Sequence, residues 1–81
     1  MTVTVLDVKK TSVVDVLSRD GETMFVYTTS LDDCTLTRWD VYEGTRLVRG
    51  RSKRFSSEWE AECFASLVVE DAIRDGWTIS R

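Results

Sequence analysis

The stretch "SSEWEAECFASLVVEDAIRDG" (residues 56–76) contains the strongest helix signal in the chain and decides the fold class. Ser57 and Glu60 have the spacing of a capping box, in which the two side chains satisfy backbone N–H groups at the start of a helix. Gly76 is a stop signal, because glycine readily takes the left-handed conformation in which many helices end. We therefore expect a helix over residues 57–75.

Apolar residues at helical spacing give this helix a face that should pack on a sheet. They are Ala61, Phe64, Ala65, Val68 and Ala72, with Leu67 and Val69 on the flanks. Trp59, Cys63, Ser66 and Glu70 fall on the opposite face. For Trp59 we consider two alternatives: a staple that folds back onto Phe55 or the sheet, and an exposed anchor for a partner protein. The staple is favoured, because a single exposed aromatic side chain needs no function.

The residues before this helix are rich in Val, Thr, Tyr and Phe, which favour strands. The strand-like segments are residues 2–8, 12–18, 22–30, 35–43 and 45–55, and the alternating residues 77–80 can add a short final strand. A chain of 81 residues has room for one domain with a thin core. The sequence therefore predicts a single α+β domain over residues 1–81, with an antiparallel sheet of four to five strands packed against one helix in the C-terminal half.

Two glycine-containing turns predict the register of the strands. Asp20-Gly21 suits a two-residue hairpin loop, and counting outward from it pairs Val16 with Phe25 and Val14 with Tyr27 on a face that we expect in the core.

A similar loop at Glu43-Gly44 would set Trp39 opposite Val48. Period two then places Trp39, Val41 and Val48 inward, and it places outward Arg38, Asp40, Tyr42, Arg49, Arg51 and Lys53.

The residue types argue against catalysis and metal binding. The chain has no histidine, so it lacks the commonest general base and transition-metal ligand. Cys34 and Cys63 lie 29 positions apart without a second thiol nearby, so we interpret them as reduced and partly buried. Asp32-Asp33 beside Asp15 is the nearest candidate carboxylate pair, and we interpret it as a turn. We therefore expect no enzymatic activity, no cofactor and no metal.

The sequence also predicts where the protein is found. No apolar run approaches the roughly 20 residues of a membrane span, and the first ten residues lack the order of a secretion signal. We therefore expect a cytoplasmic protein without membrane contact.

Charge is distributed unevenly along the chain. Residues 38–54 carry six positive and two negative charges, whereas residues 55–81 carry two positive and six negative ones, a net charge of +4 followed by −4. The glutamates of "SEWEAE" would repel a nucleic acid bound to the basic hairpin beside them. This bipolar surface favours a non-enzymatic protein-protein interaction module, and a homodimer is also compatible with it. The partner-binding residues that we expect are Arg38, Tyr42, Arg49, Arg51, Lys53, Glu58, Trp59, Glu62 and Glu70.

Two resemblances suggest what kind of partner is bound. "GRSKRFSSEWEAECFASLVVEDA" resembles the end of a double-stranded-RNA-binding domain, with Gly50, Ser52, Lys53 and Arg54 in the place of its basic turn and Ala61 and Ala65 in the place of its helix alanines. Phe55 and the following serines interrupt that pattern, and glutamates replace its basic residues. The resemblance implies the alternative function, nucleic-acid binding through the basic hairpin.

In size and charge the chain is similar to the phage-encoded inhibitors of bacterial defence systems, which include anti-CRISPR proteins. This similarity implies that the partner is a nucleic-acid-handling protein complex. The acids Glu58, Glu60, Glu62, Glu70, Asp71 and Asp75 would then mimic phosphates, and Trp59, Arg49 and Arg51 would be anchors.

Overall fold

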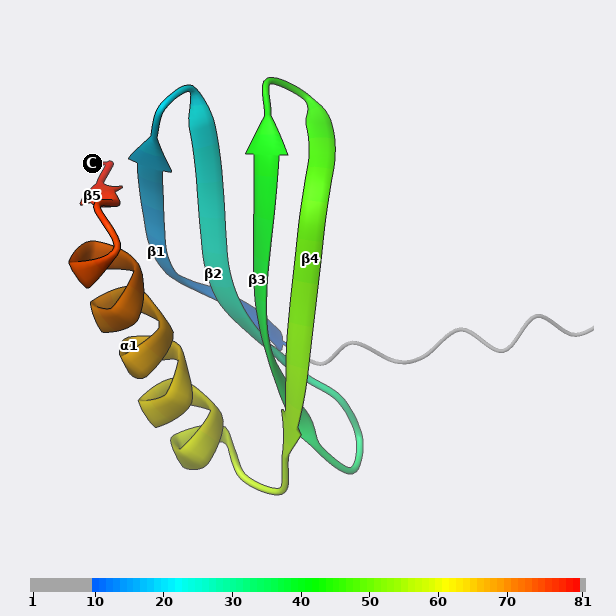
Figure 1. The fold of residues 1–81 in the computed structure, drawn as a ribbon. Coiled ribbons are helices and arrows are strands. Elements are labelled where there is room, and N and C mark those ends of the chain that lie inside the picture. Colours follow the sequence, from blue (N-terminus) through cyan, green and yellow to red (C-terminus); the bar gives the residue numbers. More distant parts are fainter. Residues whose placement is uncertain (1–9, 81) are drawn as a thin grey trace, which may run out of the picture.

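Four long strands precede the helix and one very short strand follows it in the computed structural model, which describes residues 10–80 (Figure 1). The elements are β1 (Lys10–Arg19), β2 (Glu22–Ser30), β3 (Thr35–Glu43), β4 (Arg46–Phe55), α1 (Glu58–Arg74) and β5 (Thr78–Ile79). The strands form one antiparallel sheet in the order β4-β3-β2-β1-β5. The predicted two-layer α+β fold is confirmed. The strand expected at residues 2–8 lies outside the described residues.

The ends of α1 follow the predicted signals. The Ser57 hydroxyl accepts a hydrogen bond from the backbone N–H of Glu60 and donates one to the Glu60 carboxylate. The helix ends before Gly76, whose φ of 96° lies in the left-handed region.

The helix buries a face slightly rotated from the predicted one. Its buried residues are Ala61, Ala65, Val69 and Ala72. Val69, expected on the flank, belongs to the core, and Leu67 on the other flank is exposed. Three alanines let the helix backbone approach the sheet closely, where it packs on Leu17, Met24, Val26 and Val41. Trp77, just beyond the helix end, is 3% exposed and belongs to the same core.

The β1–β2 hairpin has the predicted turn, but of its predicted core residues Phe25 lies on the open face, whereas Val14 does pack against the core. Asp20 and Gly21 both have positive φ, and Val16 pairs with Phe25 as expected. A register shift next to Val14 then brings Val13, and not Val14, opposite Tyr27. The helix covers the other face of this hairpin, so Phe25 is 36% exposed. Counting from a turn predicts the pairs only as far as the first register shift, and it does not say which face the helix will cover.

The β3–β4 hairpin contains the largest departure from the predicted register. Its loop is Gly44-Thr45, since Glu43 pairs with Arg46. Val48 is an extra, exposed residue between Leu47, which pairs with Tyr42, and Arg49, which pairs with Val41. Beyond this bulge, the side chains of β4 lie on the face of the sheet opposite to the predicted one.

The bulge changes which face of the sheet the basic side chains occupy. Arg49, Arg51 and Lys53 share the helix-side face with Val41 and Trp39, so their predicted outward placement was wrong. The inward placement of Val48 was also wrong, because it is exposed. Arg38, Asp40 and Tyr42 point away from the helix as predicted, which leaves Asp40 beside Gly50 on the open face of the sheet.

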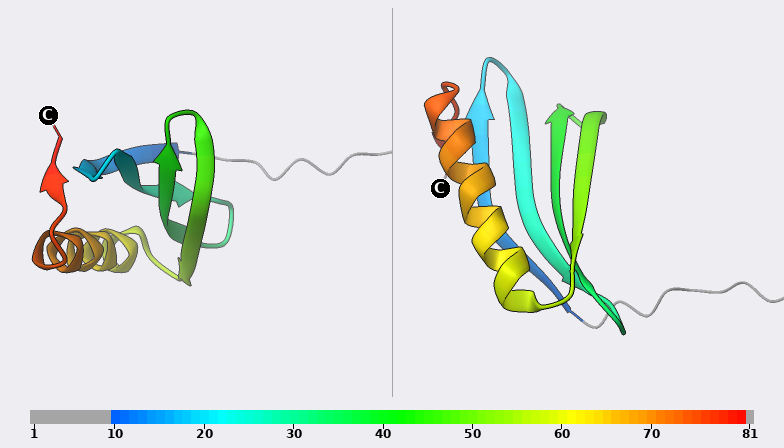
Figure 2. Two further views of the ribbon diagram at one scale, coloured as in Figure 1. Left: turned by 45° about the horizontal axis from the view of Figure 1, so that its top comes forward. Right: turned by 60° about the horizontal axis from the view of Figure 1, so that its bottom comes forward.

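The helix crosses the sheet obliquely. It begins close to the end of β4 and finishes beside β5, while the tip of the β3–β4 hairpin stands away from its C-terminal end (Figure 2). Thus α1 covers the middle of the sheet, and the helix-side face near β4 stays partly open.

Candidate functional site

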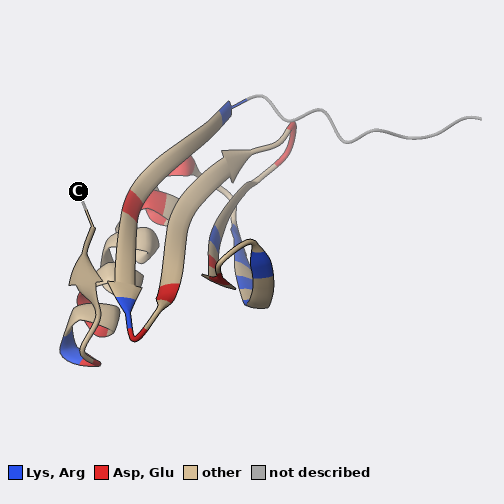
Figure 3. Cartoon of the chain, turned by 90° about the horizontal axis from the view of Figure 1, so that it is seen from above, with Lys and Arg blue, Asp and Glu red and all other residues tan. Residues whose placement is uncertain are grey.

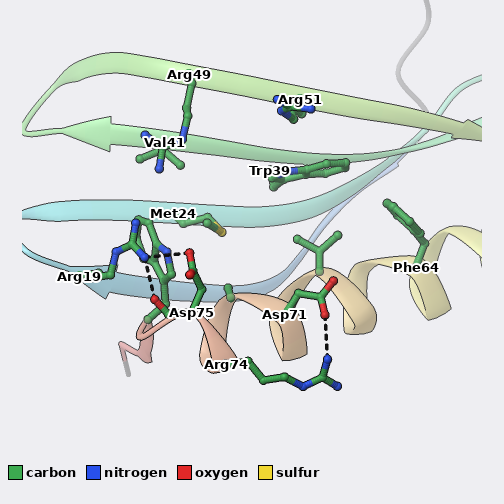
Figure 4. A pocket seen from close by; sticks show the side chains of 13 residues that line it. Arg19, Met24, Trp39, Val41, Arg49, Arg51, Phe64, Asp71, Arg74 and Asp75 are labelled. Atoms are coloured by element: carbon green, nitrogen blue, oxygen red, sulfur yellow. Dashed lines mark hydrogen bonds and ion pairs between the residues drawn. The ribbon is translucent and has the colours of Figure 1, made fainter.

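A groove of about 590 Å³ lies between α1 and β4 on the helix side of the sheet (Figure 4). Met24, Trp39 and Val41 form its apolar floor. The helix contributes an apolar wall, made of Phe64, Val68 and Ala72, and a charged rim, made of Asp71, Arg74 and Asp75. The remaining lining residues are Arg49 and Arg51 from β4 and Arg19 and Trp77 at one end.

The β4 wall of the groove is cationic, because the bulge at Val48 turns Arg49 and Arg51 toward the helix side. In Figure 3 Lys and Arg residues recur along β4. The Arg49 guanidinium lies 3.5 Å from the Glu22 carboxylate. Arg51 forms no ion pair with any residue in the described part of the chain and pairs across the strands with Trp39. An uncompensated guanidinium therefore stands beside an apolar floor.

The charged groups on the opposite rim compensate one another. Arg19 lies over the Trp77 ring, 4.7 Å from its centroid, and donates hydrogen bonds to the backbone oxygen and the carboxylate of Asp75 at 2.7 and 2.9 Å. Asp71 pairs with Arg74 at 3.1 Å. Because both carboxylates of this rim are already paired, the free charge of the groove is positive.

An aromatic cluster closes the end of the groove near the start of the helix. The Phe64 ring packs against the rings of Trp39 and Phe55, with centroid distances of 5.6 and 5.3 Å. The Lys53 ammonium lies 4.8 Å from the Phe64 centroid, a cation–π distance. Lys53 thus covers the aromatic cluster, and it forms no ion pair within residues 10–80.

This arrangement has the features of a binding site. A ligand could bury apolar side chains against the floor. A ligand carboxylate could accept two parallel hydrogen bonds from the Arg51 guanidinium. The described residues contain no group of His, Cys, Asp and Glu that could hold a metal ion. Both cysteines are free; Cys34 is buried, whereas Cys63 is exposed, contrary to the predicted partial burial.

The predicted binding residues lie on three separate surfaces. Arg49, Arg51 and Lys53 border the groove or its aromatic end. Arg38 and Tyr42 lie on the opposite face of the sheet. Glu58, Trp59, Glu62 and Glu70 are exposed on the helix.

Trp59 does not form the expected staple, because its side chain is 72% exposed. Phe55, which the staple would have used, packs on Phe64 instead. Glu58 accepts a hydrogen bond from the Ser30 hydroxyl at 2.7 Å, so this acid ties the start of the helix to β2.

Sequence reasoning missed Arg19, Met24 and Trp77 as lining residues. Arg19 and Trp77 meet only because β5 pairs with β1, where Ser18 lies opposite Thr78. The one sequence signal for Trp77 was its place at the start of the alternating residues 77–80, directly after the helix stop. No signal within β1 marks Arg19.

No protein-family model, curated protein or solved structure matches the chain. The double-stranded-RNA-binding resemblance also fails at its basic turn, because Gly50, Ser52, Lys53 and Arg54 lie within β4 and not in a turn. Among the described residues, no helix has the length and apolarity to cross a membrane.

Proposed function

We propose that the domain is a protein-binding module whose groove between α1 and β4 receives a partner segment with an apolar side chain and a neighbouring carboxylate. The observation that carries the proposal is the position of Arg51, which has no ion pair among the described residues and pairs across the strands with Trp39 of the floor. No reacting group is needed for this role.

The energetics favour a ligand that combines both features. Burial of apolar surface contributes about 25 cal/mol per Å². An exposed ion pair alone contributes only about 0 to 1 kcal/mol, so a purely acidic segment would bind weakly. A carboxylate placed beside an apolar anchor is shielded from water by that anchor, and the arginine then adds specificity for acidic partners.

Selection from a random peptide library displayed on phage tests this proposal. We expect the wild-type domain to enrich sequences in which Asp or Glu lies within about three positions of a large apolar residue. Arg51→Glu should lose this enrichment, because it replaces the attracting charge by a repelling one. The matched control is Arg54→Glu, which makes the same charge change on the same strand, but on the open face opposite Leu36. It should retain the enriched motif.

Two outcomes would contradict the groove as the binding site. One is enrichment by Arg51→Glu of the same acidic motif as the wild type. The other is equal loss in Arg51→Glu and Arg54→Glu, which would indicate a general effect of net charge. Circular dichroism of both variants checks that they are folded.

A narrower form of the proposal is that the partner is a nucleic-acid-handling protein and that the domain inhibits it. Support comes from Glu62 and Glu70, which are exposed on the helix and can occupy sites built for phosphates. Asp71 and Asp75 support it less, because their carboxylates are paired within the domain. If the domain's partner binds DNA or RNA, prior binding of that nucleic acid should block capture of the domain.

A second candidate function is direct binding of single-stranded nucleic acid along β4. It is favoured by Arg49, Arg51 and Lys53 beside the aromatic rings of Trp39 and Phe64, since such surfaces combine cations with stacking platforms. Fluorescence polarisation with labelled single strands tests it. Affinity should fall by at least about tenfold between roughly 50 and 200 mM salt. Arg51→Glu should weaken binding more than Arg54→Glu, because Arg54 lies on the open face, away from the aromatic rings. Absence of binding at the lower salt would exclude this function.

A further inference from the structure

The open face of the sheet, opposite the helix, carries a second concavity that the proposed groove does not use. It has a volume of about 410 Å³ and is lined by Thr11 and Val13 from β1, Phe25 and Tyr27 from β2, and Asp40 and Tyr42 from β3. Phe25 and Tyr42 meet edge to face, with centroids 5.7 Å apart and planes at 83°. The rings therefore form a corner with aromatic surface on two sides.

Asp40 is the one charged residue in this lining, and it is buried. Its side chain is only 8% exposed. Tyr27 donates a hydrogen bond to Oδ2 at 2.7 Å, whereas the buried Oδ1 accepts no hydrogen bond from the described residues. Burial raises the pKa of Tyr27, and the hydrogen bond to Asp40 and its charge raise that pKa further, so the phenol stays protonated as a donor.

The neighbouring Arg38 compensates this carboxylate incompletely. Its guanidinium nitrogen lies 3.5 Å from Oδ1 without making a hydrogen bond, and its side chain is 38% exposed. Water therefore screens the positive charge of Arg38 more strongly than the negative charge of Asp40. Arg38 is also absent from the lining of the concavity. We therefore expect the concavity, whose one charged lining residue is Asp40, to favour a cation over an anion.

We infer that this concavity binds a cation, the ammonium group of a lysine side chain from a partner protein, beside Asp40 and the Phe25–Tyr42 corner. Aromatic faces attract cations, and the attraction grows when water is excluded. The apolar surface of Val13 and Phe25 suits the four-carbon stem of lysine, which commonly packs on apolar surface while its charged end seeks a polar partner. The site lies on the opposite face from the groove, so the two proposals stand or fall separately.

Titration with n-butylammonium, a mimic of the lysine side chain, tests the inference, with n-butanol as the uncharged probe of equal chain length. NMR signals of the Phe25 and Tyr42 rings report binding. The ammonium should bind about five- to tenfold more tightly than the alcohol, as expected for a partly desolvated cation–π site with a carboxylate. Asp40→Asn should abolish that preference. Glu70→Gln, which removes the same charge from the exposed face of the helix, should preserve it.

A second variant keeps the test decisive if Asp40→Asn fails to fold. Tyr42→Leu retains apolar contact and leaves Asp40 in place, so it should lower the affinity for the ammonium about two- to fivefold without changing that for the alcohol. Equal affinity for the two probes in the wild type would overturn the inference. The inference would also be overturned if the Phe25 ring signals gave the same affinity for the ammonium in Tyr42→Leu as in the wild type. It would likewise be overturned if the ammonium caused no saturable shifts in the wild type.

Discussion

Trp77→Ala should lower the free energy of unfolding by about 3–5 kcal/mol, as expected for loss of a buried tryptophan. Trp77 is 3% exposed and joins the core formed by α1 and the sheet. Its backbone N–H also bonds the Ala72 carbonyl, so the residue fixes how the chain leaves the helix. Removing its ring leaves a cavity beneath Arg19, which loses the surface on which it lies.

The effect would be visible as a much lower urea midpoint or a folded fraction well below one. Domains of this size are stable by only about 5–15 kcal/mol, and small ones lie at the lower end. Urea denaturation followed by far-UV circular dichroism measures the change.

Trp59→Ala is the matched control, because it makes the same chemical change on a side chain that is 72% exposed. Its effect should stay within about 0.5 kcal/mol. Similar losses in both variants would contradict the assigned burial of Trp77 and the free position of Trp59.

The elements that were predicted correctly rest on local signals. The helix was recognisable from Ser57, Glu60 and Gly76, and the first hairpin from Asp20-Gly21, because caps and tight turns depend on a few adjacent residues. The structure uses all of them. Local chemistry therefore predicted the order of the elements and their approximate bounds.

The faces of the strands were harder to predict, because both faces of β2 are apolar. Met24 and Val26 alternate with Phe25 and Tyr27, and nothing in the strand says which set the helix will cover. The aromatic pair looked like the better core, yet its rings remain on the open face, where they line the second concavity. The aliphatic pair packs more closely under the alanines of α1.

The candidate groove depended on one irregularity that the sequence does not reveal. The bulge at Val48 uses an ordinary β-branched residue, with no glycine to mark it. Without the bulge, Arg49 and Arg51 would face away from the helix, as predicted from regular alternation. The residues that complete the groove, Arg19 and Trp77, come from opposite ends of the described chain and are joined only by the pairing of β5 with β1.

Gly50→Ala should destabilise the domain by about 1–3 kcal/mol, the usual range for overpacking at a closely packed site. A Cβ atom at position 50 would lie 2.6 Å from Asp40 Oδ1, far inside van der Waals contact. A free carboxylate would simply turn away. Asp40 is held by the 2.7 Å hydrogen bond from Tyr27 and is almost fully buried, so it must break that bond or push β4 away from β3.

A double-mutant cycle separates this clash from a general intolerance of strand β4 to substitution. Asp40→Ala removes the atom that the new Cβ would meet, so Gly50→Ala should cost less in that background than in the wild type, by about 1 kcal/mol or more. Alanine also reduces the conformational freedom of the unfolded chain relative to glycine, which should make the substitution nearly neutral once the clash is gone. Strictly additive free energies of unfolding would show that the Asp40 carboxylate can move away from the new Cβ atom, and that the hydrogen bond from Tyr27 does not hold it in place.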